Sequence, residues 1–417
     1  MACAEPWTLS RALEVSRTRN SDVRIAALRI EQARALERQV ASAAMPQLSV
    51  GASYSASNQA LPGFGFILNQ RAFSNAINFN RPGTVDDLGL SGTVRYAVYR
   101  GGSVVANRRA AAHGSKAVEA EANAVRNDVE LAVTQAFLML GQARESVAAI
   151  GAGVRALEAA EAVAKARFEA GNLLKADLLN IGVQLALLRE QASLADNRAA
   201  LARRALLVLL GLAEDDALVL ADNDSSIAAL AAPETRNPVA RPEIAALEAR
   251  VRAAEQGLRA AGGERLPEVN AFGSYGWDHG FKMDRSGEGW MAGVSVDLKV
   301  FDGGRASARV RQARAELELA KAQLDKLQLG IRQEVEAASL AHSAALERLR
   351  VSAGVVEQAS ESAEISRARF ASGALLSSDL LAVESRLTEA QLRRSLALAD
   401  ERSALAQLRR ALGLSLF

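Results

Sequence analysis

ARFEAGNLLKADLL at residues 166–179 is repeated as ARFASGALLSSDLL at residues 368–381. Nine of the fourteen positions are identical, at an offset of 202 residues. The same offset relates Leu210-Gly211-Leu212 to Leu412-Gly413-Leu414, whereas an offset of 221 relates Met45-Pro46 to Leu266-Pro267. The first copy therefore holds 19 extra residues between Pro46 and Tyr99. Such a tandem duplication predicts one body built from two equivalent halves.

Three regions follow from this internal match. Residues 1–212 form the first structural repeat, with a β-hairpin at about 47–99, and residues 242–417 form the second, with a β-hairpin at about 268–300. Residues 213–241 join the repeats, and we expect them to form part of a belt around the helices.

The composition argues against several classes of protein. The net charge is only +2 with 24% charged residues, and no basic block suggests nucleic acid. Cys3 is the single cysteine, so an intramolecular disulfide is excluded, and His113, His279 and His342 lie far apart, which disfavours a zinc site. No run of eighteen apolar residues exists, which excludes an ordinary membrane-spanning helix and leaves open a β-barrel, whose strands alternate.

Long helices dominate both halves. The stretch from Ser103 to about Phe168 contains no proline, and it predicts one helix of 66 residues. At about 1.5 Å per residue this helix would be roughly 100 Å long, too long for a compact core. Gly171 and Gly373 are placed to end the long helices. The other expected helices are Arg305 to Phe370, the returning helices Lys175 to Leu210 and Ser377 to Leu412, and a third pair, Asp22 to Ala44 and Glu243 to Gly262, that would stack end to end with them.

Two arrangements of these helices are compatible with the sequence pattern. A coiled coil is the simpler one, but the heptad pattern is not strict and small residues recur on more than one face. Each helix is therefore expected to contact neighbours on two sides, as in the wall of a tube.

Four segments alternate apolar and polar residues with a period of two: 48–56, 88–98, 269–277 and 290–300. This is the length and pattern of transmembrane β-strands, and Tyr96, Tyr99, Trp277 and Trp290 stand near their ends, where aromatic girdles lie. A soluble hairpin would look similar, but two equivalent hairpins joined to such long helices favour the membrane. Four strands cannot close a barrel, so the chain must oligomerise; two copies would give eight strands and a filled interior, and three would give twelve and an aqueous lumen.

At this point the chain resembles TolC-type outer-membrane efflux proteins. The resemblance extends from Trp7-Thr8-Leu9 through both hairpins, the turns Gly101-Gly102 and Gly303-Gly304, both repeated motifs and both Leu-Gly-Leu endings; Gly63 to Arg71 resembles the first surface loop of pump-associated members. It implies a mainly α fold with a small β part: tandem long α-helical hairpins forming a periplasmic α-barrel, and four β-strands per chain contributing to a trimeric twelve-stranded transmembrane β-barrel.

The resemblance also implies a location and partners. The homotrimer would lie in the outer membrane of a Gram-negative bacterium, with a long periplasmic extension. An inner-membrane pump, commonly of the resistance-nodulation-division class, and a periplasmic adaptor would feed it small molecules such as drugs, solvents or metal ions. A type I protein-secretion duct would share the architecture. A periplasmic helical adaptor or scaffold is the alternative from another class, but it would not need two amphipathic strand pairs.

Both helix tips are candidate sites. The resemblance implies that they dock the adaptor, through Arg167, Phe168 and Gly171 in the first and Arg369, Phe370 and Gly373 in the second. The simpler interpretation is that each glycine only completes a helical turn.

The channel gate is expected at the same place. Asp177 and Asp379 stand six residues after the tip glycines, so three chains would form carboxylate rings, or else these residues only favour the positive ends of their helices. Phe370 and Leu375 occupy positions where family members carry a tyrosine and an arginine that lock the closed state. The closed tip of this chain should therefore depend more on apolar packing and less on salt bridges.

Other motifs carry weaker expectations. Cys3 resembles the lipid-bearing first residue of some members, although the apolar residues that should precede it are absent, and we expect a signal peptide missing from this start. The Gly-Gly pairs lack the further residues of a phosphate-binding loop. No catalytic spacing is visible, so neither an enzyme nor a cofactor is expected. Loops 57–87 and 278–289 should lie at the outer surface, with Phe64, Phe66 and Phe73 either lining the mouth or packing within the loop.

Overall fold

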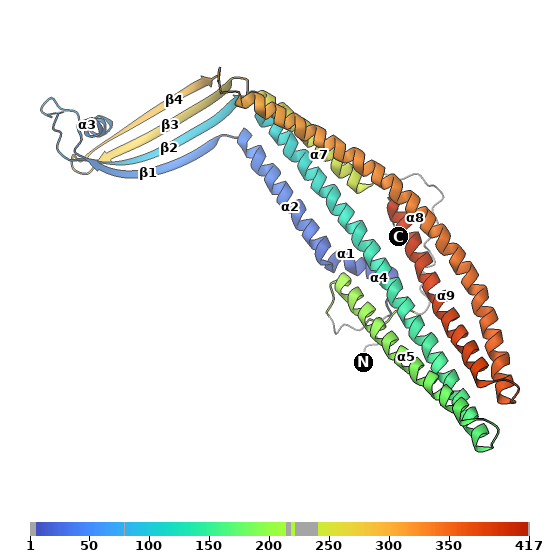
Figure 1. The fold of residues 1–417 in the computed structure, drawn as a ribbon. Coiled ribbons are helices and arrows are strands. Elements are labelled where there is room, and N and C mark those ends of the chain that lie inside the picture. Colours follow the sequence, from blue (N-terminus) through green and yellow to red (C-terminus); the bar gives the residue numbers. More distant parts are fainter. Residues whose placement is uncertain (1–5, 79, 214–217, 222–240, 416–417) are drawn as a thin grey trace. The chain divides into compact units, whose positions relative to one another are not determined.

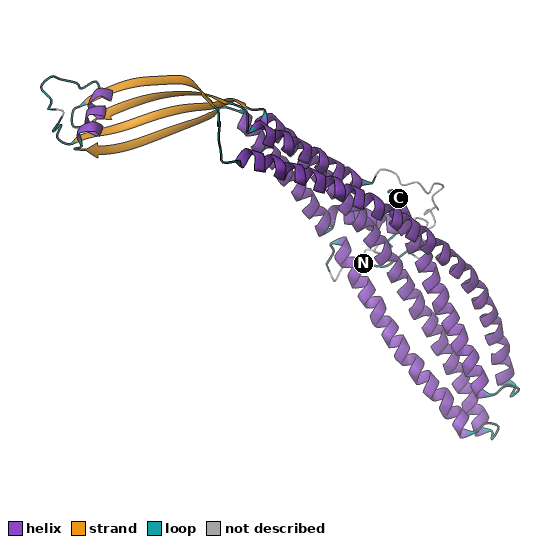
Figure 2. Cartoon of the chain, turned by 45° about the horizontal axis from the view of Figure 1, so that its top comes forward, coloured by secondary structure: helices purple, strands orange, loops and turns teal. Residues whose placement is uncertain are grey.

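The computed structural model describes residues 6–78, 80–213, 218–221 and 241–415 (Figure 1). They form two compact units, each described here by itself. The tip unit comprises residues 1–29, 119–245 and 325–417, and the sheet unit comprises residues 30–118 and 246–324. Helices make up most of the described chain and the strands form one sheet (Figure 2). The elements in order are α1 (Leu9–Arg19), α2 (Ser21–Ala41), the 3-10 turn η1 (Ser42–Ala44), β1 (Gln47–Ser57), α3 (Ala60–Asn69), β2 (Val85–Arg100), α4 (Ser103–Glu169), α5 (Lys175–Leu210), α7 (Pro242–Gly263), β3 (Glu268–Gly280), β4 (Arg285–Asp297), α8 (Arg305–Ala371) and α9 (Ser377–Ala411).

The two long helices are confirmed. α4 and α8 are each 67 residues long, one more than expected. Each is followed by a glycine in the left-handed region, Gly171 at φ 77° and Gly373 at φ 83°. A side chain is strained at such angles, so glycine is the residue that ends each helix at lowest cost. α5 has the predicted bounds, and α9 ends one residue early.

The short helices meet end to end at two equivalent junctions in the tip unit. Before α2, the Asn20 side chain donates to the carbonyl of Leu209 at the end of α5, at 2.7 Å. Before α7, 221 residues later, Arg241 donates to the carbonyl of Ala411 at the end of α9, at 3.3 Å. The carbonyls at a helix end have no partner inside the helix, so each junction supplies one. The predicted stacking is confirmed at these junctions.

The first helix, α1, was not predicted. Thr8 caps it, since its hydroxyl accepts a hydrogen bond from the Arg11 backbone N–H at 3.3 Å. Its buried face, including Leu9 and Leu13, joins a core with α4 and α5. The same core contains Leu220, whose neighbour Val219 accepts from the Trp7 backbone N–H at 2.7 Å. This short stretch is the described part of the expected belt; residues 214–217 and 222–240 lie outside the described residues.

A cluster of charges joins four helices at the second junction. Arg410 donates to Asp128 of α4, Glu243 of α7 and Glu334 of α8. Arg241, with only 4% of its side chain exposed, bonds Glu243 at 2.9 Å and Glu334 at 2.7 Å. Burial alone would raise the pKa of Glu243, but the hydrogen bond from Arg241 and the charges of both arginines lower it overall. The carboxylate of Glu243 therefore holds the junction in its ionised form.

The four strands form one antiparallel sheet in the order β1-β2-β3-β4. The expected fourth strand, 290–300, is wrong in its bounds: β4 begins at Arg285 and ends at Asp297. Pairing explains the shift, because β4 follows β3 from Glu268 opposite Asp297 to Gly280 opposite Arg285. β2 likewise extends back to Val85. The expected loops, 57–87 and 278–289, are accordingly shorter, and the second is a turn of residues 281–284.

The first of these loops contains an unpredicted helix, α3, which packs on the sheet (Figure 1). Ile67 is fully buried. At its end, a Cβ on Gly287 of β4 would lie 1.9 Å from the Asn69 carbonyl oxygen, so only glycine allows this approach. Gln70, also fully buried, donates to the Asp86 carbonyl at 2.7 Å and to the Asp87 carboxylate at 2.8 Å. Phe64 and Phe66 therefore lie on a helix that packs on the sheet.

Candidate functional site

The sheet has one apolar and one polar face. Directly opposed residues lie on the same face, and Val50, Gly92, Tyr275 and Trp290 form one such row across all four strands. Val50 is 83% exposed and Trp290 79% exposed. The remaining large apolar residues of this face are Leu48, Tyr54, Leu88, Leu90, Val94, Tyr96, Tyr99, Val269, Trp277, Val294 and Val296, and its polar residues His279 and Glu288 lie near the turn between β3 and β4. A continuous apolar surface of this extent, facing outward, is unusual for a chain in water.

The opposite face carries hydroxyl and amide groups. Ser49, Thr93 and Ser274 form a row on it, and Asn270 and Ser295 form another. The α3 end also lies on this face, since Gln70 bonds Asp87, which opposes Ser55 of β1. The register thus confirms the predicted alternation.

A β-bulge at Val98 preserves this separation of the faces. Ala97 opposes Asn270 and Tyr99 opposes Val269, so Val98 is the additional residue. The period-two alternation predicts Val98 as a regular apolar position of the strand. This prediction is wrong, because Val98 has no partner in β3. The bulge reverses the alternation after it and returns Tyr99 to the apolar face.

The two helix tips have the same backbone design. In the first, the N–H of Asn172 donates to the Arg167 carbonyl at 2.8 Å, and that of Gly171 donates to Phe168 at 2.9 Å. In the second, Ala374 donates to Arg369 at 2.8 Å and Gly373 to Phe370 at 3.1 Å. These paired bonds close a Schellman-type helix end.

The side chains break that symmetry. Arg167 of the first tip reaches the second, where Nη1 donates to the Phe370 carbonyl at 2.9 Å and the guanidinium lies 5.3 Å from the Phe370 ring centre. Its Nη2 donates to the Asn172 carbonyl at 3.3 Å. Arg369, the equivalent residue, is exposed, and no ion pair or hydrogen bond of its guanidinium is found among the described residues. One arginine thus joins the two tips of a chain.

Apolar packing joins them as well. Phe370 is 2% exposed and packs with Ile181 and Leu380, with Leu375 at the edge of the cluster. Its equivalent, Phe168, is 38% exposed. Phe370 and Leu375, two of the predicted gate residues, therefore take part in the packing of the two tips against each other within one chain.

The two predicted gate carboxylates differ in their contacts. Asp177 is half-buried and accepts a hydrogen bond from the Ser377 hydroxyl of the other tip at 2.6 Å. Asp379 is exposed at the start of α9. Sequence equivalence did not reveal the Ser377 bond, because the repeat places Lys175 at the position of Ser377. Of the two carboxylates, Asp379 is therefore the more exposed.

Other kinds of site are sparse. Among the described residues, no group of three or more His, Cys, Asp or Glu side chains could hold a metal ion. None of the helices described is both long and apolar enough to span a bilayer. Cys3, the predicted lipidation site, lies outside the described residues.

Comparison with known proteins identifies the family. The family model of outer membrane efflux proteins matches residues 12–212 and 239–414, which is most of the chain. The chain belongs to this family. Members of the family form outer-membrane ducts for efflux, with long helical extensions into the periplasm of Gram-negative bacteria. This chain is accordingly an outer-membrane efflux protein with such a helical extension. No curated protein matches it.

Solved structures of the same fold cover almost the whole chain. A membrane protein from Pseudomonas aeruginosa is 21% identical with a TM-score of 0.83, over 97% of this chain and 93% of that one. The outer membrane protein VceC from Vibrio cholerae is 19% identical with a TM-score of 0.80, over 98% and 97%. The open state of the MtrE channel from Neisseria gonorrhoeae is 19% identical with a TM-score of 0.76, over 98% and 89%. At these identities the similarity establishes the fold, and the predicted TolC-like fold class is confirmed.

Proposed function

We propose that three copies of this chain form a passive duct through the outer membrane, through which small molecules leave the cell. An inner-membrane pump of the resistance-nodulation-division class and a periplasmic adaptor would deliver them, since family members act in such three-part systems. Drugs, solvents and metal ions are the substrate classes that this family membership favours.

One observation carries the proposal: the sheet combines an outward apolar face with two open edges. β1 and β4 are the edge strands, and each leaves one row of backbone groups without a ladder partner. In lipid, each unpaired group costs several kcal/mol, so the edges must pair with those of other copies. Three copies supply twelve strands, enough to surround water, whereas an eight-stranded barrel is filled by its own side chains.

The orientation of the sheet follows from the same argument. The apolar face, with Val50 and Val294, would contact lipid, and the polar face, with Ser49 and Thr93, would line the lumen.

Adjacent residues on β1 test this orientation. Val50→Arg places a charge on the apolar face, where it should cost about 2–4 kcal/mol at the bilayer midplane. Ser49→Arg is the matched control, at nearly the same depth on the polar face. We expect the first variant to reduce the amount of trimer in the outer-membrane fraction and the second to leave it near the wild-type level.

Light scattering of the purified protein gives the second readout. We expect a trimer that requires detergent. A monomer of native-like helicity without detergent, or equal losses for Val50→Arg and Ser49→Arg, would refute the proposal.

A further inference from the structure

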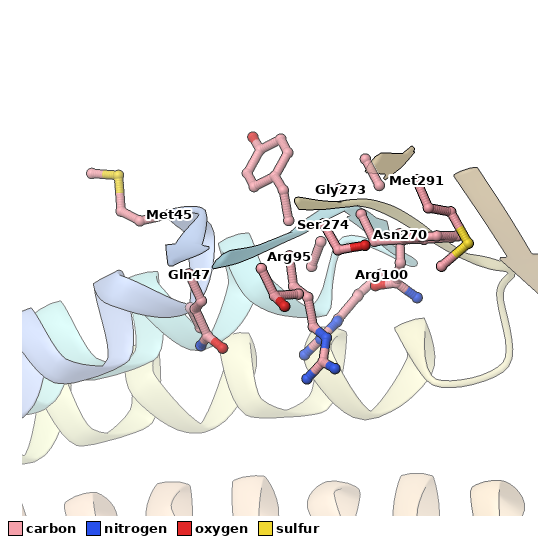
Figure 3. Close-up of a pocket in the computed structure, with 14 residues that line it drawn as sticks. Met45, Gln47, Arg95, Arg100, Asn270, Gly273, Ser274 and Met291 are labelled. Atoms are coloured by element: carbon pink, nitrogen blue, oxygen red, sulfur yellow. The ribbon is translucent and has the colours of Figure 1, made fainter. Parts of the chain in front are cut away.

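A hollow of 590 Å³ lies on the polar face of the sheet, close to where β1 begins (Figure 3). β2 and β3 supply most of its lining, and the rest is Ala43, Met45, Gln47 of β1 and Met291 of β4. Its volume is within the range of about 300–1,000 Å³ that is usual for small-molecule sites.

Two arginines enter this hollow because of the β-bulge. Arg95 and Arg100 are five residues apart, and an odd spacing would place them on opposite faces of a regular strand. The additional residue, Val98, reverses the alternation, so Arg95 opposes Phe272 and Arg100 opposes Glu268 on the same face. Figure 3 shows both side chains lining the same hollow.

The lining contains no carboxylate to balance these charges. The nearest candidate by register is Glu268, but its carboxylate lies 3.7 Å from the ammonium of Lys299 instead. In the described part of the chain, neither guanidinium makes an ion pair or a side-chain hydrogen bond. Two guanidinium groups that converge on one space without an anion offer several charge-assisted donors to a carboxylate, sulfonate or phosphate.

The remaining lining fits an apolar body joined to that anionic group. Asn270 and Gln47 add neutral polar groups, while Phe272 and Met291 supply apolar surface. The Phe272 ring lies directly over Gly293, where an added Cβ would be 2.7 Å from the ring, so Gly293 provides the space that the ring occupies.

The second repeat does not carry equivalents of these two arginines. The offset of 202 places Asp297 at the position of Arg95 and Asp302 at the position of Arg100. Asp302 has a different task, since it accepts from the backbone N–H of Ala306 at 2.7 Å and so caps α8. The arginine pair is therefore specific to the first repeat.

We propose that this hollow binds small organic anions with a flat, apolar body. That the hollow lies on the export route rests on the proposed function, because the polar face lines a lumen only in the proposed trimeric duct. The binding itself requires neither transport nor a partner, since a single chain forms the whole lining.

Fluorescein, a flat aromatic dianion, is the probe, and rhodamine 6G, a flat aromatic cation, is its counterpart. Both are titrated by fluorescence anisotropy against the full chain purified in detergent at low salt. We expect fluorescein to bind more tightly than rhodamine 6G. Arg95→Gln and Arg100→Gln should each weaken fluorescein binding about tenfold, because each removes charge-assisted hydrogen bonds.

Two further variants separate a specific site from general charge. Arg95→Lys keeps the charge and should weaken binding by no more than about threefold. Arg285→Gln removes an exposed arginine from the other end of the sheet and should have no effect. Equal affinity for both dyes, or equal effects of Arg95→Gln and Arg285→Gln, would overturn the inference. Because no transport is measured, such a failure is distinct from a failure of the proposed function.

Discussion

Arg167→Ala should loosen the second helix tip more than the first. Arg167 donates to the Phe370 carbonyl from the other tip, so its removal weakens the contact between the tips and leaves only the Ser377–Asp177 bond and the packing of Phe370. The repeat supplies a matched control, Arg369→Ala, at the equivalent but exposed position.

The size of the effect follows from the contacts of Arg167. A hydrogen bond from a charged donor contributes about 1.5–3 kcal/mol, and the 2.9 Å bond to Phe370 is partly buried. The 3.3 Å bond to Asn172 is exposed and contributes less, and the guanidinium over the Phe370 ring adds about 0.5–1 kcal/mol. A total of about 2–3 kcal/mol corresponds to a change of about 30- to 150-fold in the population of the opened tip.

Amide hydrogen exchange measures this opening directly. The N–H groups of Gly373 and Ala374 bond to the end of α8, so they exchange only when the second tip opens. In Arg167→Ala, a peptide covering residues 368–376 should exchange faster by the factor given above. In Arg369→Ala, the same peptide should keep its rate within about twofold.

Two other contacts join the tips, the packing of Phe370 and the Ser377–Asp177 hydrogen bond. If these contacts are enough to hold the second tip, Arg167→Ala will exchange at the wild-type rate. That result, or equal acceleration by Arg167→Ala and Arg369→Ala, would refute the assignment of Arg167 as the link between the tips.

Three further predictions concern charge and geometry. In the folded chain the pKa of Glu243 is below its ordinary value of 4.5. The ionised Glu243 therefore stabilises the folded state fully above pH 4.5, and this contribution is lost as the pH falls through the folded pKa. Glu243→Gln should flatten the acid dependence of the unfolding temperature below about pH 4.5. Gly373→Leu forces a side chain into φ 83° and should abolish efflux in a resistance assay, while crosslinking still detects the trimer; normal efflux would exclude docking through this tip. Asp379→Asn should reduce cation selectivity and divalent block in single-channel recordings, and Asp177→Asn should change them less because Asp177 is bonded to Ser377; unchanged currents in Asp379→Asn would exclude the carboxylate ring.

Local signals in the sequence were enough to predict the two long helices and the two returning helices, but not α1 or α3. The long helices lack proline, and glycines at 171 and 373 end them, so their bounds depend on residues close in the chain. The strand faces were also predictable, since alternation is local. The bounds of β4 were not, because they depend on pairing with β3.

The features that the sequence did not predict depend on contacts between distant residues. α3 forms where the surface loop packs on the sheet, and Gly287, more than 200 residues away, leaves room for its end. Val98 fits the apolar alternation of its strand, and only the pairing of Ala97 and Tyr99 with β3 exposes the bulge. No periodicity within one strand contains that information.

The differences between the repeats have a common physical origin. The internal duplication gives both tips the same backbone. Within one chain, however, the two tips contact each other through different sides, so equivalent side chains have different neighbours. Arg167 and Phe370 are in contact, whereas Arg369 and Phe168 are exposed. If three chains close into the proposed ring, the second tip of one chain meets the first tip of the next. Arg369 and Phe168 would then face each other across that boundary, so the pair left exposed within one chain has the chemistry to repeat the same contact between chains.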